Sequence, residues 1–329
     1  MDTAVPANIC VIIAAKDAAE TIGVAVRSAL AQEEVGRVVV VDDGSSDATA
    51  DAAAASGGGD SRLDVIRLTR NQGPSAARNR AIALSYEPLI AVLDADDAFL
   101  PGRFKRLLEL TEWDMAAGNI AFVSQLGQAL QAEPQDGIFD LDLAGFVRGN
   151  LTRRGVQRGE YGFLKVLLRR DFMERHGLRY DETLRLGEDY DLYARALAAG
   201  ARFRVTRACG YEALLRPDSL SARHSTRDLA RFAEVDRRLL GRPGLSAATR
   251  EALEQHLAET RQKHLLRSFL DERQQDGPIA ALGRLASRPE AWGPVVGGVL
   301  ADKLAPLRRL GRSEATEKTV RYLLPDRRA

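Results

Sequence analysis

The first hundred residues alternate short apolar runs with stretches in which apolar residues recur every three or four positions. Residues 9–15, ICVIIAA, form a continuous run rich in β-branched side chains, typical of a strand buried on both faces of a parallel sheet. In residues 21–32 the apolar positions from Ile22 to Leu30 have helical spacing, and Thr21 is the expected cap. The chain therefore begins with a predicted strand and helix.

The same alternation follows twice more, and a fourth strand then ends the series. A strand at 38–41 leads through the polar turn DDGSSD into an alanine-rich helix. The short strand DVIRL precedes a helix in GPSAARNRAIALS, where Pro74 suits the first turn. A fourth strand, LIAVLDADD, ends in aspartates. Strands that alternate with helices in this way predict an open, mainly parallel α/β sheet flanked by helices, with right-handed crossovers.

Three predicted strand ends, at residues 14–17, 42–45 and 94–97, are acidic or small. Ligands of such sheets bind outside the carboxyl ends of the strands. One acidic turn is explained by helix capping, but three together place several carboxylates around one crevice. Asp94 and Asp96 are separated by one residue, so in an extended segment they point the same way and can converge on a divalent cation. Such a cation can stabilise a diphosphate leaving group. No G-x-G-x-x-G follows the first strand, and the chain has no P-loop.

Five segments carry a family resemblance. They are VIIAAKDAAETI, VVVVDDGSSDAT, NQGPSAARNRAI, VLDADDAFLPGRF and LGEDYDLYARAL. In order and approximate spacing they resemble the family 2 glycosyltransferases of the GT-A fold, a Rossmann-like fold, and among these the bacterial enzymes that build succinoglycan-like exopolysaccharides. The resemblance extends over residues 9–225. It implies a GT-A domain at 1–225, followed by a helical C-terminal region at 226–329.

The resemblance also implies a donor site for a UDP-sugar. Asp43 matches the carboxylate that accepts a hydrogen bond from uracil, and Arg78 matches a basic residue near the nucleotide. Asp94 and Asp96 match the D-x-D motif that meets ribose and a diphosphate bound by Mg²⁺ or Mn²⁺. The full set of donor-binding residues expected on this basis is Ala14, Ala15, Asp17, Asp43, Arg78, Asp94, Ala95, Arg216 and Arg223. The expected metal ligands are Asp94, Asp96 and His224.

The first nucleotide loop departs from the family pattern. Many relatives have Pro-x-Tyr-Asn after the first strand, whereas this chain has Ala14-Ala15-Lys16-Asp17, so the aromatic partner expected near the base is missing. Lys16 either reaches a phosphate or is solvated. The departure weakens the assignment of uridine more than the assignment of the family.

Glu188 and Asp189 begin an amphipathic helix, where the helix dipole favours acidic side chains, so a charged first turn would explain both residues without a function. The resemblance instead implies that Asp189 is the general base of a single displacement that inverts the anomeric centre. Asp191 is the substitute candidate, and Glu188 is expected to orient the acceptor or the helix.

The segment LLRPDSLSARHS resembles the family's arginine-containing loop that closes over the diphosphate. Arg216 and Arg223 are the candidates for charge-assisted contacts with it. His224 is either the last ligand of the metal or a surface or capping residue.

The region from residue 228 onward has apolar residues at helical spacing, so we expect helices that pack on the sheet edge, form a dimer or build the acceptor site. Residues 300–329 are rich in Arg and Lys among leucines. This pattern is typical of an amphipathic segment on the anionic inner face of a membrane, or of a solvated terminal helix.

Composition adds limits to these predictions. The 329 residues carry a net charge of +1, which gives no general attraction to nucleic acid. Cys10 and Cys209 are expected to be buried free thiols in a reducing compartment. We find no secretory signal and no apolar run long enough to span a bilayer. The expected location is the cytoplasm, at the periphery of the plasma membrane.

Together these features predict a metal-dependent inverting glycosyltransferase. It would move a hexose, expected to be glucose from UDP-glucose, to a lipid-linked saccharide. Two alternatives remain open at this point: a catalytically silent subunit that binds sugar nucleotides or acts as a scaffold, and a nucleotidyltransferase, which would release pyrophosphate instead of UDP.

Overall fold

The computed structural model describes residues 8–131, 137–152, 160–215, 224–297 and 320–324. The chain divides into two compact units, which we describe separately. The first comprises residues 1–217 together with 320–329, and the second comprises residues 218–319. The second unit is therefore an insertion between two parts of the first.

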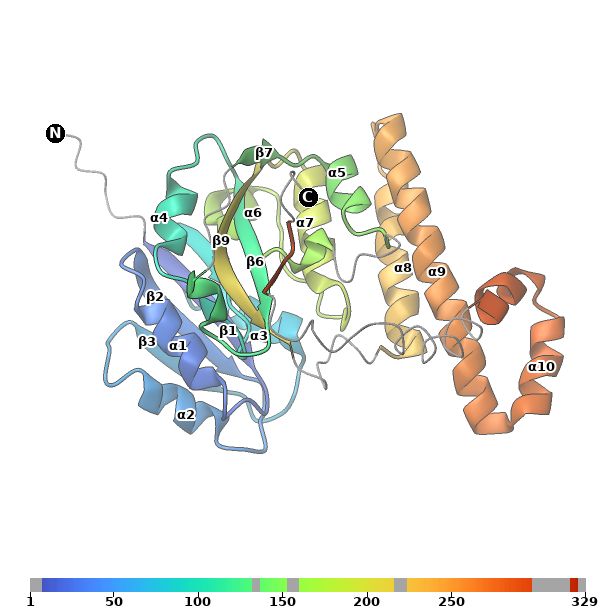
Figure 1. The fold of residues 1–329 in the computed structure, drawn as a ribbon, viewed down its shortest axis with the longest axis horizontal. Coiled ribbons are helices and arrows are strands. Elements are labelled where there is room, and N and C mark those ends of the chain that lie inside the picture. Colours follow the sequence, from blue (N-terminus) through green and yellow to red (C-terminus); the bar gives the residue numbers. More distant parts are fainter. Residues whose placement is uncertain (1–7, 132–136, 153–159, 216–223, 298–319, 325–329) are drawn as a thin grey trace. The chain divides into compact units, whose positions relative to one another are not determined.

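The first unit is built on one ten-stranded sheet, whose central order is β3-β2-β1-β4-β8-β6-β9-β5 (Figure 1). These strands are, in that order, Leu63–Arg67, Val35–Asp42, Ile9–Ala15, Leu89–Val92, Leu167–Arg169, Met115–Val123, Phe203–Leu214 and Ala98–Phe99. Strands β3 to β4 are parallel, and β6 and β9 are parallel to each other, whereas β8 runs antiparallel between β4 and β6. The predicted open, mainly parallel sheet is confirmed.

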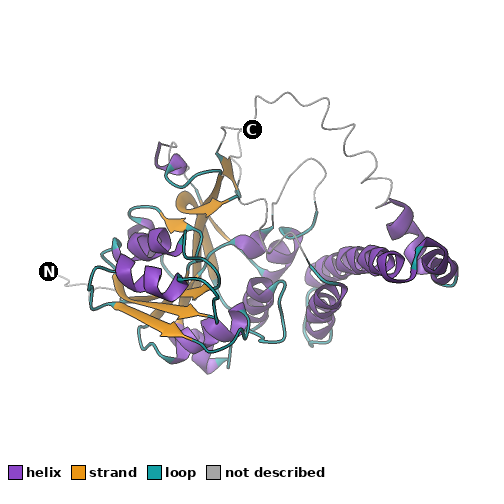
Figure 2. Ribbon diagram, turned by 90° about the horizontal axis from the view of Figure 1, so that it is seen from below, coloured by secondary structure: helices purple, strands orange, loops and turns teal. Residues whose placement is uncertain are grey.

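Helices cover both faces of this sheet (Figure 2). They are α1 Ile22–Leu30, α2 Thr49–Ser56, α3 Pro74–Ala83, α4 Arg103–Leu108, α5 Leu143–Arg148, α6 Arg170–Arg175 and α7 Glu188–Ala198, with short 3₁₀ turns at Gln128–Gln131 and Tyr161–Phe163. All residues of β1 from Ile9 to Ile13 have no exposed surface, as expected for a strand covered on both sides. Burial of each such large apolar side chain contributes about 1.5–3 kcal/mol.

Two local predictions need correction. Thr21 occupies the N-cap position of α1, but its side chain accepts no capping bond, because its backbone is already helical, with φ of −112° and ψ of −34°, instead of extended. Its hydroxyl donates to the Ala18 carbonyl at 3.3 Å. Both cysteines are free thiols, but only Cys10 is buried, and Cys209 on β9 is partly exposed. Its strand lies beside β5 toward one end of the sheet order, where cover is less complete than over β1.

The chain returns to the first sheet after the second unit. Strand β10, Arg321–Tyr322, pairs antiparallel with β6, and β7, Ile138–Asp140, pairs antiparallel with β9. The fully buried side chain of Asn119 donates to the Leu324 carbonyl at 2.9 Å and accepts from the Leu324 amide at 2.8 Å. Residues 320–324 therefore complete one side of β6.

The second unit is helical where it is described. The predicted helical region at 226–329 needs one correction, since residues 320–324 belong to the first unit and include β10. Helix α8, Thr226–Leu240, begins with a capping box at Ser225, and it is followed by α9, Ala247–Asp276, and α10, Pro278–Ala286. A buried pair links the first two helices, with His256 Nδ1 2.7 Å from Asp236 Oδ2. None of the helices in the described ranges has the length and apolarity needed to cross a membrane.

Candidate active site

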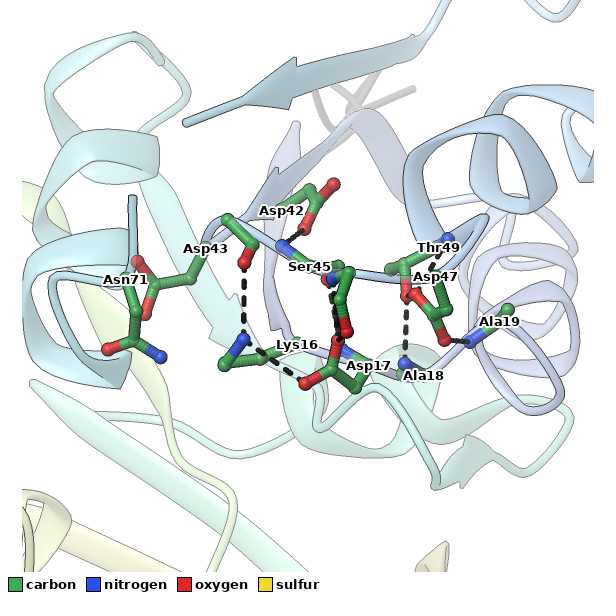
Figure 3. Close-up of polar contacts among 12 residues, drawn as sticks. Lys16, Asp17, Ala18, Ala19, Asp42, Asp43, Ser45, Asp47, Thr49 and Asn71 are labelled. Atoms are coloured by element: carbon green, nitrogen blue, oxygen red, sulfur yellow. Dashed lines mark hydrogen bonds and ion pairs between the residues drawn. The ribbon is translucent and has the colours of Figure 1, made fainter. Parts of the chain in front are cut away.

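The turns after β1 and β2 contact each other at the carboxyl edge of the sheet (Figure 3). Asp17 has a left-handed backbone conformation, with φ of 48°, and its carboxylate accepts from the Ser46 amide at 2.8 Å and the Ser46 hydroxyl at 3.0 Å. Lys16 donates to the Gly44 carbonyl at 3.1 Å and forms an ion pair with Asp17 at 3.1 Å. Both residues are exposed, and Ala14 and Ala15 end the strand beneath them. The two turns thus form one polar rim.

Asp43 is buried, and both of its carboxylate oxygens are in use. They accept from the backbone amides of Gln72 at 2.6 Å and Gly73 at 2.7 Å. The next residue, Gly44, has φ of +67°, and a side chain there would lie 2.7 Å from the backbone carbon of Arg70. Asp43 therefore joins the turn after β2 to the start of α3. Each oxygen retains a second lone pair, so its contact with uracil stays a prediction.

Asp94, at the end of β4, is held by two buried cations. Arg78 on α3 donates from Nη2 to Asp94 Oδ1 at 3.1 Å, and Lys165 Nζ lies 2.8 Å from Asp94 Oδ2. Burial alone would raise the pKa of Asp94, but Lys165 and Arg78 outweigh it and lower that pKa to about 2. Asp94 is therefore ionised and fixed in place.

The same cations hold the two acids that begin α7. Arg78 Nη1 donates to Glu188 Oε1 at 3.0 Å and lies 3.7 Å from Asp189 Oδ1. Lys165 donates to Asp189 Oδ2 at 3.3 Å, and the Tyr180 hydroxyl donates to Asp189 Oδ1 at 3.1 Å. Asp94, Glu188 and Asp189, which the sequence predicted as site residues, thus lie together around Arg78 and Lys165. We call these five residues the charge cluster.

Asp191 has a different environment. It is buried, and Oδ2 accepts from Nε and Nη2 of Arg195, one turn further along α7, at 2.9 and 2.6 Å. Arg195 thus holds one oxygen of Asp191 on the same helix. Asp191 is 1% exposed and Asp189 9%, so Asp189 is the more accessible of the two carboxylates.

Asp97 connects the D-x-D segment to β9. Its carboxylate is buried and accepts from the Tyr211 hydroxyl at 2.7 Å and the Leu214 amide at 2.9 Å, both on β9. Burial, followed by the negative charges of Asp94 and Asp96, raises the pKa of Asp97 well above its usual range. The two hydrogen bonds to β9 fix the backbone just after Asp94 and Asp96.

These residues fit a divalent cation in part. In the portion of the chain that the structure describes, no three His, Cys, Asp or Glu side chains are arranged to hold a metal on their own. Asp94 and Asp96 supply two carboxylates, and Mg²⁺ is commonly held by one or two carboxylates together with substrate phosphates. His224 belongs to the second unit, and Arg216 and Arg223 lie outside the described residues.

Sequence reasoning missed several residues of this site. Lys165, Tyr180 and Tyr211 carry no motif, and only their contacts with aspartates reveal them. Asp97 was visible as the third aspartate of its run, and its burial distinguishes it from the other two.

Comparisons with known proteins define the class first. The fold is similar to that of S. aureus TarS, residues 1–349, in complex with UDP-GlcNAc, with a TM-score of 0.61 and 18% identity over 87% of this chain and 79% of that one. It is also similar to the mannosyltransferase PcManGT from Pyrobaculum calidifontis in complex with GDP-Man and Mn²⁺, with a TM-score of 0.55 and 17% identity over 94% and 84% of the two chains. These likenesses establish a GT-A glycosyltransferase fold.

The family follows from the sequence. Residues 10–174 match the model of glycosyl transferase family 2. The succinoglycan biosynthesis protein ExoU of Rhizobium meliloti (strain 1021) is 49% identical over 98% of this chain and 97% of its own length. The succinoglycan biosynthesis protein ExoO of the same strain is 37% identical over 65% of this chain and 62% of its own. The chain belongs to glycosyl transferase family 2.

Proposed function

We propose that the protein is an inverting glycosyltransferase that moves a hexose, expected to be glucose from UDP-glucose, to a lipid-linked saccharide during synthesis of a succinoglycan-type exopolysaccharide. The observation that carries the proposal is the charge cluster, in which the D-x-D aspartate and the proposed base share two buried cations. The near full-length similarity to a succinoglycan biosynthesis protein supports the pathway. The TarS complexes with UDP and UDP-GlcNAc support a UDP-sugar donor.

In the proposed reaction, Asp189 acts as the general base. Tyr180 and Lys165 each occupy one site on its two oxygens, and a carboxylate has about four lone-pair sites, so a position remains for an acceptor hydroxyl. Asp189 takes the hydroxyl proton as the acceptor oxygen bonds to the anomeric carbon. The bond from that carbon to the diphosphate oxygen breaks on the opposite face, and UDP leaves with the electron pair. A single displacement of this kind inverts the anomeric centre.

A divalent cation, Mg²⁺ or Mn²⁺, belongs to this proposal, with Asp96 and Asp94 as the residues that would hold it. When bound, it supplies positive charge for the departing diphosphate. Asp94 is already oriented by Arg78 and Lys165, so the protein contributes a fixed carboxylate at this position. The roles of Arg216, Arg223 and His224 toward the diphosphate and the metal stay predictions.

The deciding experiment measures the product. Purified protein is incubated with UDP-glucose, Mn²⁺ and a lipid extract from an R. meliloti strain lacking ExoU. We expect UDP release and labelled glucose in the lipid fraction, both stopped by a chelator. Pyrophosphate release would indicate a nucleotidyltransferase, and donor binding without turnover would indicate a silent binding or scaffold subunit. Expression of this chain in the same strain should also restore succinoglycan.

We also propose a peripheral contact with an anionic bilayer, since the acceptor would be lipid-linked. Within the second unit, Ile279 and Leu282 on α10 and Trp292 and Val296 beyond it are exposed, and the same segment carries Arg284 and Arg288. Exposed aliphatic and Trp side chains beside arginines suit the interface of a bilayer.

Replacement of these four apolar residues by Ser should abolish flotation with vesicles that contain anionic lipid. Vesicles of neutral lipid serve as the comparison, and unchanged flotation of the variant would contradict the proposed contact. Deletion of all residues after Leu300 is a poorer test, because it also removes β10 from the first unit.

A further inference from the structure

Lys165 joins two acidic residues that come from distant parts of the chain. It lies in the short segment between the 3₁₀ turn at Tyr161–Phe163 and β8, and its side chain is only 6% exposed. Its ammonium nitrogen is 2.8 Å from Asp94 Oδ2 and 3.3 Å from Asp189 Oδ2. One cation thus contacts both the donor-side carboxylate and the proposed base.

Lys165 is the cation that separates two carboxylates. Its ammonium nitrogen contacts one oxygen of Asp94 and one oxygen of Asp189, and both ion pairs lie around a lysine side chain that is only 6% exposed. Without this cation, the two carboxylates would face each other with Arg78 as the remaining cation of the charge cluster. One oxygen of each carboxylate lies within 3.3 Å of the Lys165 nitrogen, so the two negative charges are close together and would repel strongly in a buried site. Lys165 therefore fixes the spacing between the two acids as well as their orientation.

The backbone of Lys165 is itself held in place. Arg103 Nη2 donates to the Lys165 carbonyl, and the Arg103 guanidinium is buried among three rings, at 5.0 Å from Phe99, 5.7 Å from Phe104 and 5.5 Å from Tyr211. Burial lowers the pKa of Arg103 to about 10, which still leaves it charged at neutral pH. Tyr211 also binds Asp97, so this support connects Lys165 to the D-x-D segment. Because its backbone is held by Arg103, Lys165 can hold the Asp189 carboxylate in a fixed position.

We propose that Lys165 is a positioning residue for the transfer step, acting through Asp189. Its ammonium holds the Asp189 carboxylate at a fixed place relative to Asp94, and thus relative to the donor. The proposal rests on the proposed function of Asp189 as the general base. Misplacement of a catalytic group by about 1 Å can cost about 100-fold in rate, which sets the size of the expected effect.

The first experiment compares Lys165→Met with Lys165→Arg. For Lys165→Met we expect kcat for glucose transfer to fall about 100-fold, while KM for UDP-glucose changes by less than about threefold. Lys165→Arg keeps the charge and should recover part of the loss. An unchanged kcat, or a raised KM with unchanged kcat, would overturn the proposal, the second result because it marks a donor-binding residue.

Arg170→Met is the matched control for loss of a cation that is mostly covered, since the Arg170 side chain is 13% exposed. Arg170 donates to the carbonyls of Ile82 and Glu87 and to the Ser85 hydroxyl, which are structural contacts away from the charge cluster. It should lower Tm without changing kcat per folded molecule. If Lys165→Met does not fold, Lys165→Gln, which keeps a hydrogen-bond donor, takes its place.

The second experiment is a double-mutant cycle. If Lys165 acts through Asp189, then Lys165→Met combined with Asp189→Asn should be no slower than Asp189→Asn alone. Multiplied losses would show that Lys165 acts independently of Asp189 and would overturn the inference alone. Full activity of Asp189→Asn would instead overturn the proposed function, so the two failures are distinguishable.

Discussion

The turn after β2 and the segment after β4 both place carboxylates at the same edge of the sheet, but they stabilise them in different ways. Asp43 accepts two backbone amides from residues 72 and 73. Asp94 is held instead by Arg78 and Lys165, which are themselves buried and shared with α7. The first arrangement is a set of separate hydrogen bonds, whereas the second is a network of charges.

This difference has an energetic consequence. Loss of one neutral or amide-held partner leaves one buried group unsatisfied, at a cost of about 1–3 kcal/mol. Loss of a shared buried cation takes one partner from two or three carboxylates at once, and the cost is larger. The stability of the charge cluster is therefore the more sensitive to loss of a single side chain. The charge cluster is also the region that can serve catalysis, because its charges are fixed before a substrate arrives.

The sharpest test of this contrast is Asp189→Asn. The amide keeps the shape but cannot take a proton, so transfer should slow by about 10²–10⁴-fold, the range for loss of a general base. Donor affinity, measured by calorimetry with UDP and Mn²⁺, should change little. Asp191→Asn is the control and should be much milder. A reversed order of the two variants would move the base to Asp191.

Arg78→Met tests the network as a structural element. It leaves Glu188 without its 3.0 Å partner and removes one of the two cations around Asp94 and Asp189. We expect a loss of about 3–5 kcal/mol in the free energy of unfolding, the range for a broken buried ion pair. Urea denaturation followed by circular dichroism measures it. A loss below about 1 kcal/mol in the free energy of unfolding would mean that the carboxylates left by Arg78 become hydrated at little cost.

Asp43→Asn tests the amide-held region and should have the smallest effect. One carboxylate oxygen becomes an NH₂ group that faces a backbone N–H, so we expect a loss of about 1–3 kcal/mol in the free energy of unfolding. The same urea titration applies. A loss as large as that of Arg78→Met would remove the contrast between the two regions.

The fold of the first hundred residues could be predicted from sequence because its signals are local. Each of the first four strands is a short apolar run, and the helices after the first three have local signals of their own, such as apolar spacing in α1 and Pro74 at the start of α3. The later strands pair across long separations, such as β6 with β9 and β10, and no local pattern specifies those partners.

The candidate site, like the fold, could be predicted where its signals are local in the sequence. Acidic residues at strand ends and at the start of a helix are visible in the sequence, and the structure places Asp94, Glu188 and Asp189 together. Lys165 could not be predicted, because its importance comes from contacts with residues 71 and 24 positions away along the chain. At Thr21 the sequence suggested a contact that the structure does not have. The residue type suits a capping bond, but its side chain accepts none from α1.

The return of residues 320–324 to β6 also sets an order of events during synthesis. The amide of Asn119 is made early, but its partner Leu324 follows the whole of the second unit. Asn119 and Leu324 are 205 positions apart, and at about 5–20 residues per second this stretch takes about 10–40 s to synthesise. The helical insertion is made within that interval, while one side of β6 is still open. Strand β6 therefore receives its last partner only after the second unit has been synthesised.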